Sequence, residues 1–176
     1  MNFNRKMTKK EKKIMIVITG LPGSGKTSIA KEVRKKLEKV KGPSIVVNGD
    51  DIRNIFDFKG YSIDDRNKLA LPYYKFAKFI INQRFNVILT CVTLSDKDRK
   101  EWKRKSKPIF VHINSKLKNR IQFKKRIYSK NKKNIPGINQ RISRPKVVDL
   151  KIQNDYETSI ADLSLRTWKK IQLFLN

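Results

Sequence analysis

The chain has 176 residues, of which 38% are hydrophobic and 33% are charged. One domain of ordinary size accounts for this length, and the apolar content is sufficient for a packed core, which excludes a mainly disordered chain. The 43 Lys and Arg residues outnumber the 15 Asp and Glu residues and give a net charge of +28. Such a charge is typical of proteins that bind nucleic acid or an anionic membrane surface.

The composition of this charge argues against specific nucleic-acid recognition. Lys (31) outnumbers Arg (12), whereas readout of bases and phosphates favours the bidentate guanidinium group. Ile (21) and Asn (14) are also abundant and Ala (4) is scarce, a joint skew that an adenine- and thymine-rich coding sequence would produce. We therefore interpret most of the excess charge as compositional bias.

The sequence predicts neither export nor membrane insertion. Cys91 is the only cysteine, so it cannot form an internal disulfide, and no run of about 18 apolar residues is present. Residues 1–13 are basic but lack the apolar stretch of a secretory signal. We interpret them as a flexible tail that precedes a single domain over residues 14–176, and we expect a cytoplasmic location.

From Ile14 onward, short β-branched runs alternate with helical patterns, which is typical of an α/β fold with a parallel sheet. The runs predict five strands, at residues 14–18, 44–47, 87–90, 108–113 and 147–152. The helical patterns predict a helix that ends near Val40 and further helices at 64–82, 95–105, 115–128 and 155–175, with Pro72 as a kink or a restart. Residues 129–146 have little apolar periodicity and predict a long functional loop.

A phosphate-binding loop follows the first predicted strand. The segment Gly20-Leu21-Pro22-Gly23-Ser24-Gly25-Lys26-Thr27 fits the pattern G-x-x-x-x-G-K-[ST] between a strand and a helix. Backbone N–H groups and the helix N-terminus would hold the phosphates, Lys26 would reach the β- and γ-phosphates, and the Thr27 hydroxyl would bind Mg²⁺. We predict nucleotide binding by Gly20, Pro22, Gly23, Ser24, Gly25, Lys26, Thr27 and Ser28.

Carboxylate, guanidinium and aromatic groups follow the second predicted strand. Asp50 lies where a carboxylate can accept the proton of an attacking hydroxyl or hold a Mg²⁺-bound water, although Asp51 competes for this role and a helix cap is the alternative. Arg53 and Arg66 would clamp an anionic group of the acceptor, with solvated salt bridges as the alternative. Tyr61 would stack on a base, with a core aromatic as the alternative.

Together with the P-loop, the segments Asn48-Gly49-Asp50-Asp51-Ile52-Arg53 and Gly60-Tyr61-Ser62-Ile63-Asp64-Asp65-Arg66 resemble adenylylsulfate kinases, whose motifs are D-G-D-[ND]-x-R and G-F-S-x-x-D-R. Lys125-Arg126-Ile127-Tyr128 is similar to the family's K-G-L-Y, and Pro136-Gly137-Ile138-Asn139 to its T-G-I-D. The resemblance implies a three-layer P-loop kinase sandwich with a mostly five-stranded parallel sheet and a basic lid at about 116–146. It also implies a homodimer that uses ATP and Mg²⁺, and acceptor contacts by Lys125 and Ile135.

The sequence departs from the family at positions that contact the acceptor. Asn48 replaces the first motif Asp, Leu69 stands where an acceptor-contacting Asn is expected, and Ile135 replaces the Phe that sandwiches the adenine. The family's Arg-Asp pair before K-G-L-Y is Gln122-Phe123 here. Because of these changes, the chain could instead resemble cytidine diphosphoramidate kinases, which are similar to adenylylsulfate kinases and also phosphorylate a ribose 3′-hydroxyl.

The sequence therefore predicts a kinase that transfers the γ-phosphate of ATP to the 3′-hydroxyl of a nucleotide-like acceptor, either adenylyl sulfate or cytidine diphosphoramidate. A basic nucleic-acid-binding NTPase is the remote alternative. We interpret His112 as a packed core residue, because it lies in an apolar strand pattern and has no Cys or His partner at metal-ligand spacing. Cys91 is interpreted as a buried thiol at a strand end, and Trp102 and Trp168 as helix packing residues.

Overall fold

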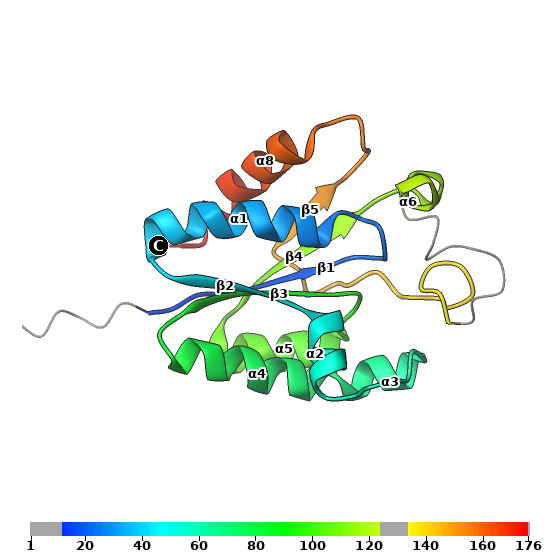
Figure 1. The fold of residues 1–176 in the computed structure, drawn as a ribbon, viewed down its shortest axis with the longest axis horizontal. Coiled ribbons are helices and arrows are strands. Elements are labelled where there is room, and N and C mark those ends of the chain that lie inside the picture. Colours follow the sequence, from blue (N-terminus) through cyan, green and yellow to red (C-terminus); the bar gives the residue numbers. More distant parts are fainter. Residues whose placement is uncertain (1–11, 124–133, 176) are drawn as a thin grey trace, which may run out of the picture.

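A parallel β-sheet forms the centre of the fold (Figure 1). The structure is a computed structural model that describes residues 12–123 and 134–175. The five strands are β1 (Met15–Thr19), β2 (Ser44–Asn48), β3 (Asn86–Cys91), β4 (Ile109–Asn114) and β5 (Leu150–Gln153), in the order β2-β3-β1-β4-β5. All four strand pairs are parallel, which confirms the predicted sheet.

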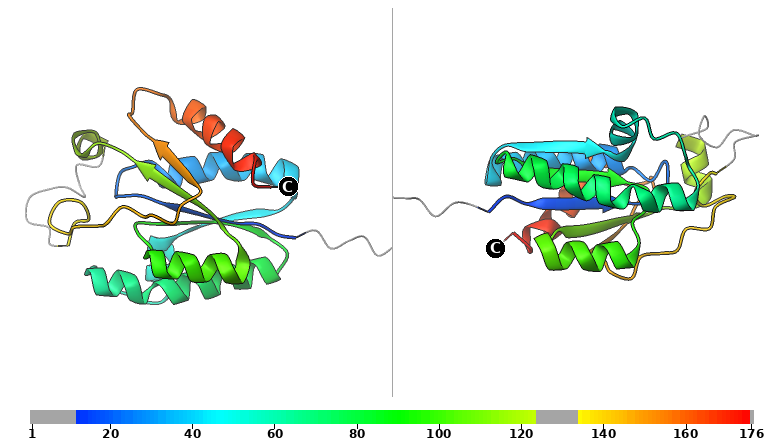
Figure 2. Two further views of the ribbon diagram at one scale, coloured as in Figure 1. Left: turned by 180° about the vertical axis from the view of Figure 1, so that it is seen from behind. Right: turned by 90° about the horizontal axis from the view of Figure 1, so that it is seen from below.

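Helices cover both faces of the sheet and complete three layers. On one face lie α1 (Lys26–Lys41) and α8 (Ile160–Gln172), and on the other lie α4 (Ala70–Asn82) and α5 (Asp96–Ser106), as Figure 2 also shows. The short helices α2 (Gly49–Ile55) and α3 (Ile63–Lys68) lie on the side of α4, and α6 (Leu117–Phe123) follows β4. In the described ranges, no helix is long and apolar enough to cross a bilayer.

The continuous apolar run of β1 supplies two separate cores. Met15 and Val17 pack into the cluster under α4 and α5, which contains Trp102, whereas Ile16 and Ile18 face the cluster under α1 and α8. Because successive side chains of a strand point to opposite faces, a strand covered on both sides needs an apolar residue at every position. Trp102 and the α8 residue Trp168 are both buried, as predicted for packing residues.

The helix predicted at 64–82 is two helices. Helix α3 is capped by Ser62, whose hydroxyl accepts from the Asp65 N–H, and it ends at Lys68. Helix α4 begins at Ala70, so the break falls at Leu69 and not at Pro72. Pro72 lies in the first turn of α4, where a backbone N–H has no partner within the helix and its absence costs nothing.

Several other boundaries differ from the prediction. The fifth strand starts at Leu150 instead of Val147, α6 starts at Leu117 instead of Ser115, and α8 spans Ile160–Gln172 instead of residues 155–175. The helix α2 was not predicted at all, because its seven residues are too few to establish an apolar period. The tail up to residue 11 and residues 124–133 of the predicted lid lie outside the described residues.

Candidate active site

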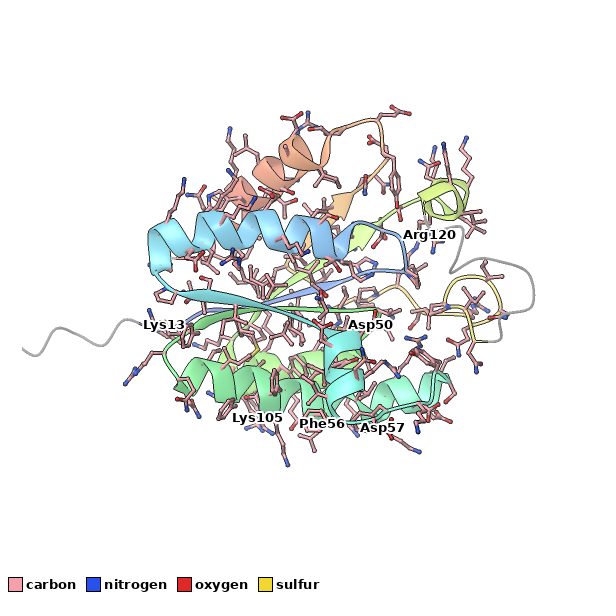
Figure 3. The ribbon with its side chains drawn as sticks, viewed as in Figure 1. Lys13, Asp50, Phe56, Asp57, Lys105 and Arg120 are labelled. Carbon is pink, nitrogen blue, oxygen red and sulfur yellow. The ribbon has the colours of Figure 1, made fainter. Side chains whose placement is uncertain are left out.

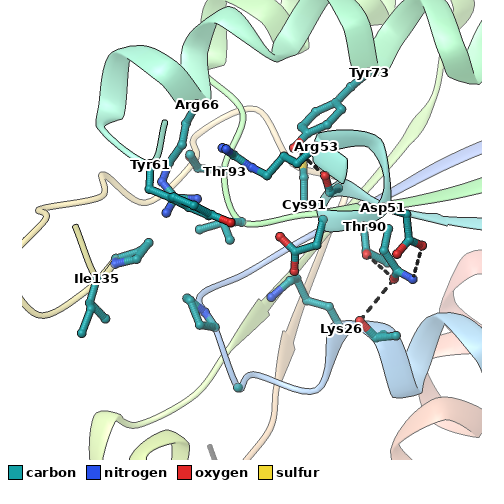
Figure 4. Close-up of a pocket in the computed structure, with 18 of the residues that line it drawn as sticks. Lys26, Asp51, Arg53, Tyr61, Arg66, Tyr73, Thr90, Cys91, Thr93 and Ile135 are labelled. Carbon is teal, nitrogen blue, oxygen red and sulfur yellow. Dashed lines mark hydrogen bonds between the residues drawn. The ribbon is translucent and has the colours of Figure 1, made fainter. Parts of the chain in front are cut away.

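A cavity of about 630 Å³ lies at the carboxyl ends of the central strands. In a parallel sheet these ends share one edge, so the loops after β1, β2 and β3 converge there. Figure 4 shows the cavity between the P-loop and the segments that carry the second motif. It brings together most of the predicted site residues, namely Pro22, Gly23, Lys26, Thr27, Asp50, Arg53, Tyr61, Arg66 and Ile135.

The P-loop adopts a conformation that requires glycine. Gly23 and Gly25 have φ angles of 78° and 92°, and Gly25 is the N-cap of α1. A Cβ at Gly25 would lie 2.9 Å from Nδ2 of Asn154, so space is limiting as well as φ. The side chain of Ser24 is buried, so only its backbone is available to a ligand, whereas Ser28 is exposed on α1.

Lys26 lies in the wall of the cavity, where its ammonium group donates a 3.0 Å hydrogen bond to the Leu21 carbonyl. Burial lowers the pKa of Lys26 to about 8, and the nearby Asp50 carboxylate acts in the opposite direction. A cation that is partly desolvated in this way interacts strongly with an incoming phosphate. The position therefore suits contact with a triphosphate.

A hydrogen-bonded chain links the P-loop to the second motif (Figure 4). Oδ1 of Asn48 accepts from the hydroxyls of Thr27 (3.3 Å) and Thr90 (2.9 Å), and its Nδ2 donates to Asp51 (2.9 Å). Because the Thr27 hydroxyl donates its hydrogen bond to Asn48, the lone pairs of its oxygen remain available to a cation. Asn48 thus occupies the first motif position and orients Thr27 without a charge of its own.

Asp50 projects from the first turn of α2 and is exposed to solvent. The N-cap of α2 is Asn48, and no side chain makes a capping hydrogen bond there, so the alternative that Asp50 is a helix cap is wrong. Asp50, Asp51 and Thr27 line the same cavity. One or two carboxylates and a hydroxyl, completed by water and phosphate oxygens, are a donor set that Mg²⁺ accepts, so these residues fit the ion.

Two buried guanidinium groups stand beside Tyr61. Arg53 is 3% exposed and Arg66 is 9% exposed, and neither forms a salt bridge with a carboxylate of residues 12–123 or 134–175. Arg53 donates to the Gly60 carbonyl (2.5 Å). Burial, followed by the charge of Arg53, lowers the pKa of Arg66. The alternative of solvated salt bridges is therefore wrong.

Tyr61 is 48% exposed, so the alternative of a core aromatic is also wrong. Its ring centroid lies 4.7 Å from the Arg53 guanidinium and 5.7 Å from that of Arg66. These cation–π contacts orient the ring at the cavity wall. Ile135, which is buried, lines the same cavity (Figure 4).

Gln140 connects the segment that begins at Asn134 to these two arginines, which we call the arginine cluster. Its side chain is buried, accepts from Nε of Arg66 (3.4 Å) and donates to the Tyr61 carbonyl (2.8 Å). The position where an acceptor-contacting Asn was expected behaves differently, because Leu69 is 1% exposed and belongs to the core. Lys125 lies outside the described residues.

Three residues near the cavity escaped the sequence analysis. Tyr73 donates to the Gly49 carbonyl (3.3 Å) and lines the cavity, although its helical spacing suggested a core residue. From the loop after β5, Asn154 donates to the Ser24 carbonyl (3.1 Å) and Tyr156 donates to the Gly23 carbonyl. These two side chains therefore fix the backbone of the P-loop through hydrogen bonds to its carbonyl groups. No sequence motif around Asn154 or Tyr156 indicates this role.

The two remaining candidate nucleophiles or bases are held in unreactive forms. Cys91 is buried at the end of β3, and burial raises the pKa of its thiol to about 11, so it is protonated at neutral pH. His112 is half-buried, with Nδ1 3.0 Å from the Thr19 hydroxyl, and burial lowers its pKa to about 4. His112 is not simply a core residue, since it also lines a second cavity of about 660 Å³ next to Leu21.

Comparisons with known proteins point to one family and one fold. The family described as "Adenylylsulphate kinase" matches residues 12–153. A cytidine diphosphoramidate kinase of Campylobacter jejuni is 31% identical over 90% of this chain and 96% of that protein. An adenylyl-sulfate kinase of Thermodesulfovibrio yellowstonii is 27% identical over 85% of this chain and 79% of that protein. The solved APS kinase of Mycobacterium tuberculosis, in complex with AMPPNP and APS, has a TM-score of 0.79 at 23% identity and covers 92% of this chain and 98% of that one, which shows a shared P-loop kinase fold.

Proposed function

Because this chain belongs to the adenylylsulfate kinase family, we propose that it transfers the γ-phosphoryl group of ATP to the ribose 3′-hydroxyl of a nucleotide-like acceptor. The observation that carries this proposal is that the P-loop lysine Lys26 and the buried arginines Arg53 and Arg66 line one and the same cavity. Among the described residues, neither arginine has a carboxylate partner. Such a cavity has cationic groups for two anions, a triphosphate on one side and an acidic acceptor on the other.

The donor side is formed by the P-loop. The backbone N–H groups of Gly23 to Thr27 and the N-terminus of α1 hold the phosphates, and Lys26 contacts the transferring group. Thr27 would hold Mg²⁺ directly and Asp50 through water, and the ion would supply positive charge that offsets the charge of the phosphates. The role of this chain is to place the phosphorus atom in line with the acceptor oxygen.

Asp50 is the proposed proton acceptor. It lies on the cavity wall between the P-loop and the arginine cluster, and its charge acts on Lys26. In the reaction the acceptor O–H bond breaks and an O–P bond forms at the γ-phosphorus. The bond from this phosphorus to the β,γ-bridging oxygen breaks, ADP leaves, and Asp50 takes the proton. Arg53, Arg66, Tyr61, Ile135 and Lys125 would seat the acceptor.

Two acceptors remain in this proposal. Adenylyl sulfate is supported by the family match and by the relative from Thermodesulfovibrio yellowstonii. Cytidine diphosphoramidate is supported by the relative from Campylobacter jejuni, and by the buried Ile135, which offers no second aromatic face opposite Tyr61. A smaller pyrimidine loses less from that missing face than adenine does.

An ADP-release assay with the purified full chain, ATP and Mg²⁺ tests the proposal. Each acceptor is added in turn, together with simple nucleoside mono- and diphosphates, and the product is analysed by phosphorus NMR. We expect ADP release that depends on one acceptor and a new phosphate on its 3′-oxygen. ADP release stimulated by DNA or RNA, with no acceptor phosphorylated, would instead support the NTPase alternative. We also propose that the protein is a homodimer and is located in the cytoplasm.

A further inference from the structure

A second concentration of positive charge lies far from the active site. A hollow of about 550 Å³ is lined by ten of the residues that the structure describes, seven of which are basic and none acidic, against 43 basic residues in the 176 of the whole chain. We call this hollow the basic groove. Its cations come from three places: Lys12 and Lys13 before β1, Lys78 and Arg84 at the end of α4, and Arg104, Lys105 and Lys107 at the end of α5.

The basic groove is separate from the kinase site. None of its lining residues lines the 630 Å³ cavity. Lys13 precedes the first strand and so lies at the amino end of the sheet, whereas Asp50 lies at the carboxyl end (Figure 3). Compositional bias explains how many lysines the chain has, but it does not explain why segments distant in the sequence place seven cations around one hollow.

The fold neutralises little of this charge. Lys105 pairs with Glu101 (2.5 Å), and Lys13 donates to the Lys41 carbonyl (3.2 Å). Over the described ranges, Lys78, Arg84, Arg104 and Lys107 take part in no salt bridge. Like charges gathered with few acidic partners among the described residues raise the local potential and favour an external polyanion.

Two of the cations occupy costly backbone positions. Arg84 has a φ of 70° and Lys107, the C-cap of α5, has a φ of 49°. Glycine or asparagine fills this left-handed region at lower cost. Favourable interaction with helix C-termini accounts for the cations at the end of α5 and for Lys13, which donates to the Lys41 carbonyl at the end of α1. Lys12 precedes β1 and belongs to no helix.

We infer that the basic groove binds the phosphate backbone of single-stranded nucleic acid without regard to sequence. Five of the seven cations are lysines, which contact phosphates as point charges and do not read bases. The hollow has the size of a ligand pocket, which is enough for several linked phosphates of one strand. Among the described lining residues, Ile81 is the one large apolar side chain, which is too little for insertion into a membrane.

The test measures the binding of a fluorescent oligo(dT) strand of about 20 nucleotides by anisotropy at several salt concentrations. The full-length protein should bind with a Kd of about 10⁻⁶ to 10⁻⁴ M at physiological salt. The groove variant carries Lys78→Gln, Arg84→Gln, Arg104→Gln and Lys107→Gln. The control variant carries Lys39→Gln, Arg166→Gln, Lys169→Gln and Lys170→Gln, at exposed positions of α1 and α8, and has the same net charge.

The groove variant should raise the Kd about tenfold or more, and it should flatten the slope of log K against log salt by about 3. The control should change the Kd less than about twofold. Equal losses in both variants, or no binding by the wild type, would overturn the inference, as would binding of inorganic polyphosphate or anionic lipid vesicles but not of oligo(dT). Kinase activity should stay unchanged in both variants, so this result is independent of the proposed function.

Discussion

The side-chain amide of Asn48 donates a 2.9 Å hydrogen bond to the carboxylate of Asp51. Adenylylsulfate kinases carry Asp at the position of Asn48, so in this chain a neutral amide orients Thr27 while a carboxylate lies one helical turn away. The two side chains are therefore hydrogen-bonded partners in this chain, and a change at one alters the surroundings of the other.

Restoring the family residue by Asn48→Asp should lower activity. The substitution removes the donor to Asp51 and places two carboxylates within hydrogen-bond distance, so one of them must take up a proton or move. We expect kcat/KM for ATP to fall about tenfold or more, together with a lower Tm. The exchange Asn48→Asp with Asp51→Asn should recover most of the loss. Equal activity of the single and exchanged variants would show that the two side chains are not coupled.

Asp50→Asn should remove most of kcat and leave the affinity for ATP nearly unchanged. The amide keeps the size of the carboxylate but cannot accept the proton of the acceptor hydroxyl. Steady-state kinetics and binding of a non-hydrolysable ATP analogue separate the two effects. Asp57→Asn is a suitable control, since Asp57 is exposed and its ion pair in the described part of the chain is with the exposed Lys59. An unchanged kcat would remove Asp50 from the proton transfer.

The pKa of Lys26, lowered to about 8 by burial, predicts a pH dependence of ATP binding. Below that pH the ammonium form is already present, and above it the free protein must take up a proton to bind phosphate. The affinity for an ATP analogue should therefore be flat below about pH 8 and fall up to about tenfold per pH unit above it. Lys26→Arg should bind with a flat profile, because the guanidinium keeps its charge. The same decline in both proteins would place the titrating group elsewhere.

Tyr156→Phe should weaken ATP binding while preserving the fold. The hydroxyl of Tyr156 donates to the carbonyl of Gly23, and its loss frees one side of the P-loop. We expect KM for ATP to rise about five- to tenfold with kcat little changed, in line with the loss of one hydrogen bond. Tyr74→Phe removes a comparable bond to Ser106 at a distance from the cavity and should leave KM unaltered. Identical behaviour of the two variants would assign Tyr156 no part in nucleotide binding.

Gln140→Ala should affect the acceptor and not ATP. Without Gln140, Arg66 loses an acceptor and the Tyr61 carbonyl loses a donor, so the arginine cluster is less firmly placed. KM for the acceptor should rise about tenfold, with KM for ATP within about twofold of wild type. The exposed Gln172 of α8 provides the control as Gln172→Ala. A rise confined to KM for ATP would contradict the link between Gln140 and the acceptor.

The parts of the site that depend on contiguous sequence were predictable. The P-loop needs its strand, glycines, lysine and helix in one stretch, and the structure places Gly23, Lys26 and Thr27 at the cavity. The second motif was also found from its pattern, because Asp50 and Arg53 follow β2 directly and so reach the same sheet edge.

Residues whose role depends on the order of the strands were not predictable. Asn154 and Tyr156 follow β5, which is far from the P-loop in the sequence but is brought near it by the pairing of β4 with both β1 and β5. Leu69 aligns with an Asn that contacts the acceptor in the family. The break between α3 and α4 instead directs the Leu69 side chain into the hydrophobic core. The clustering of cations at the basic groove likewise required the fold.

The fate of the γ-phosphate tests the central claim most directly. ATP labelled on its γ-phosphate is incubated with Mg²⁺, the full chain and either adenylyl sulfate or cytidine diphosphoramidate, with Lys26→Ala in parallel. The label should pass to one of the two acceptors, and Lys26→Ala should slow this transfer by about 10³ or more. Label that appears only as inorganic phosphate, or transfer that continues at the full rate in Lys26→Ala, would contradict phosphoryl transfer by this P-loop.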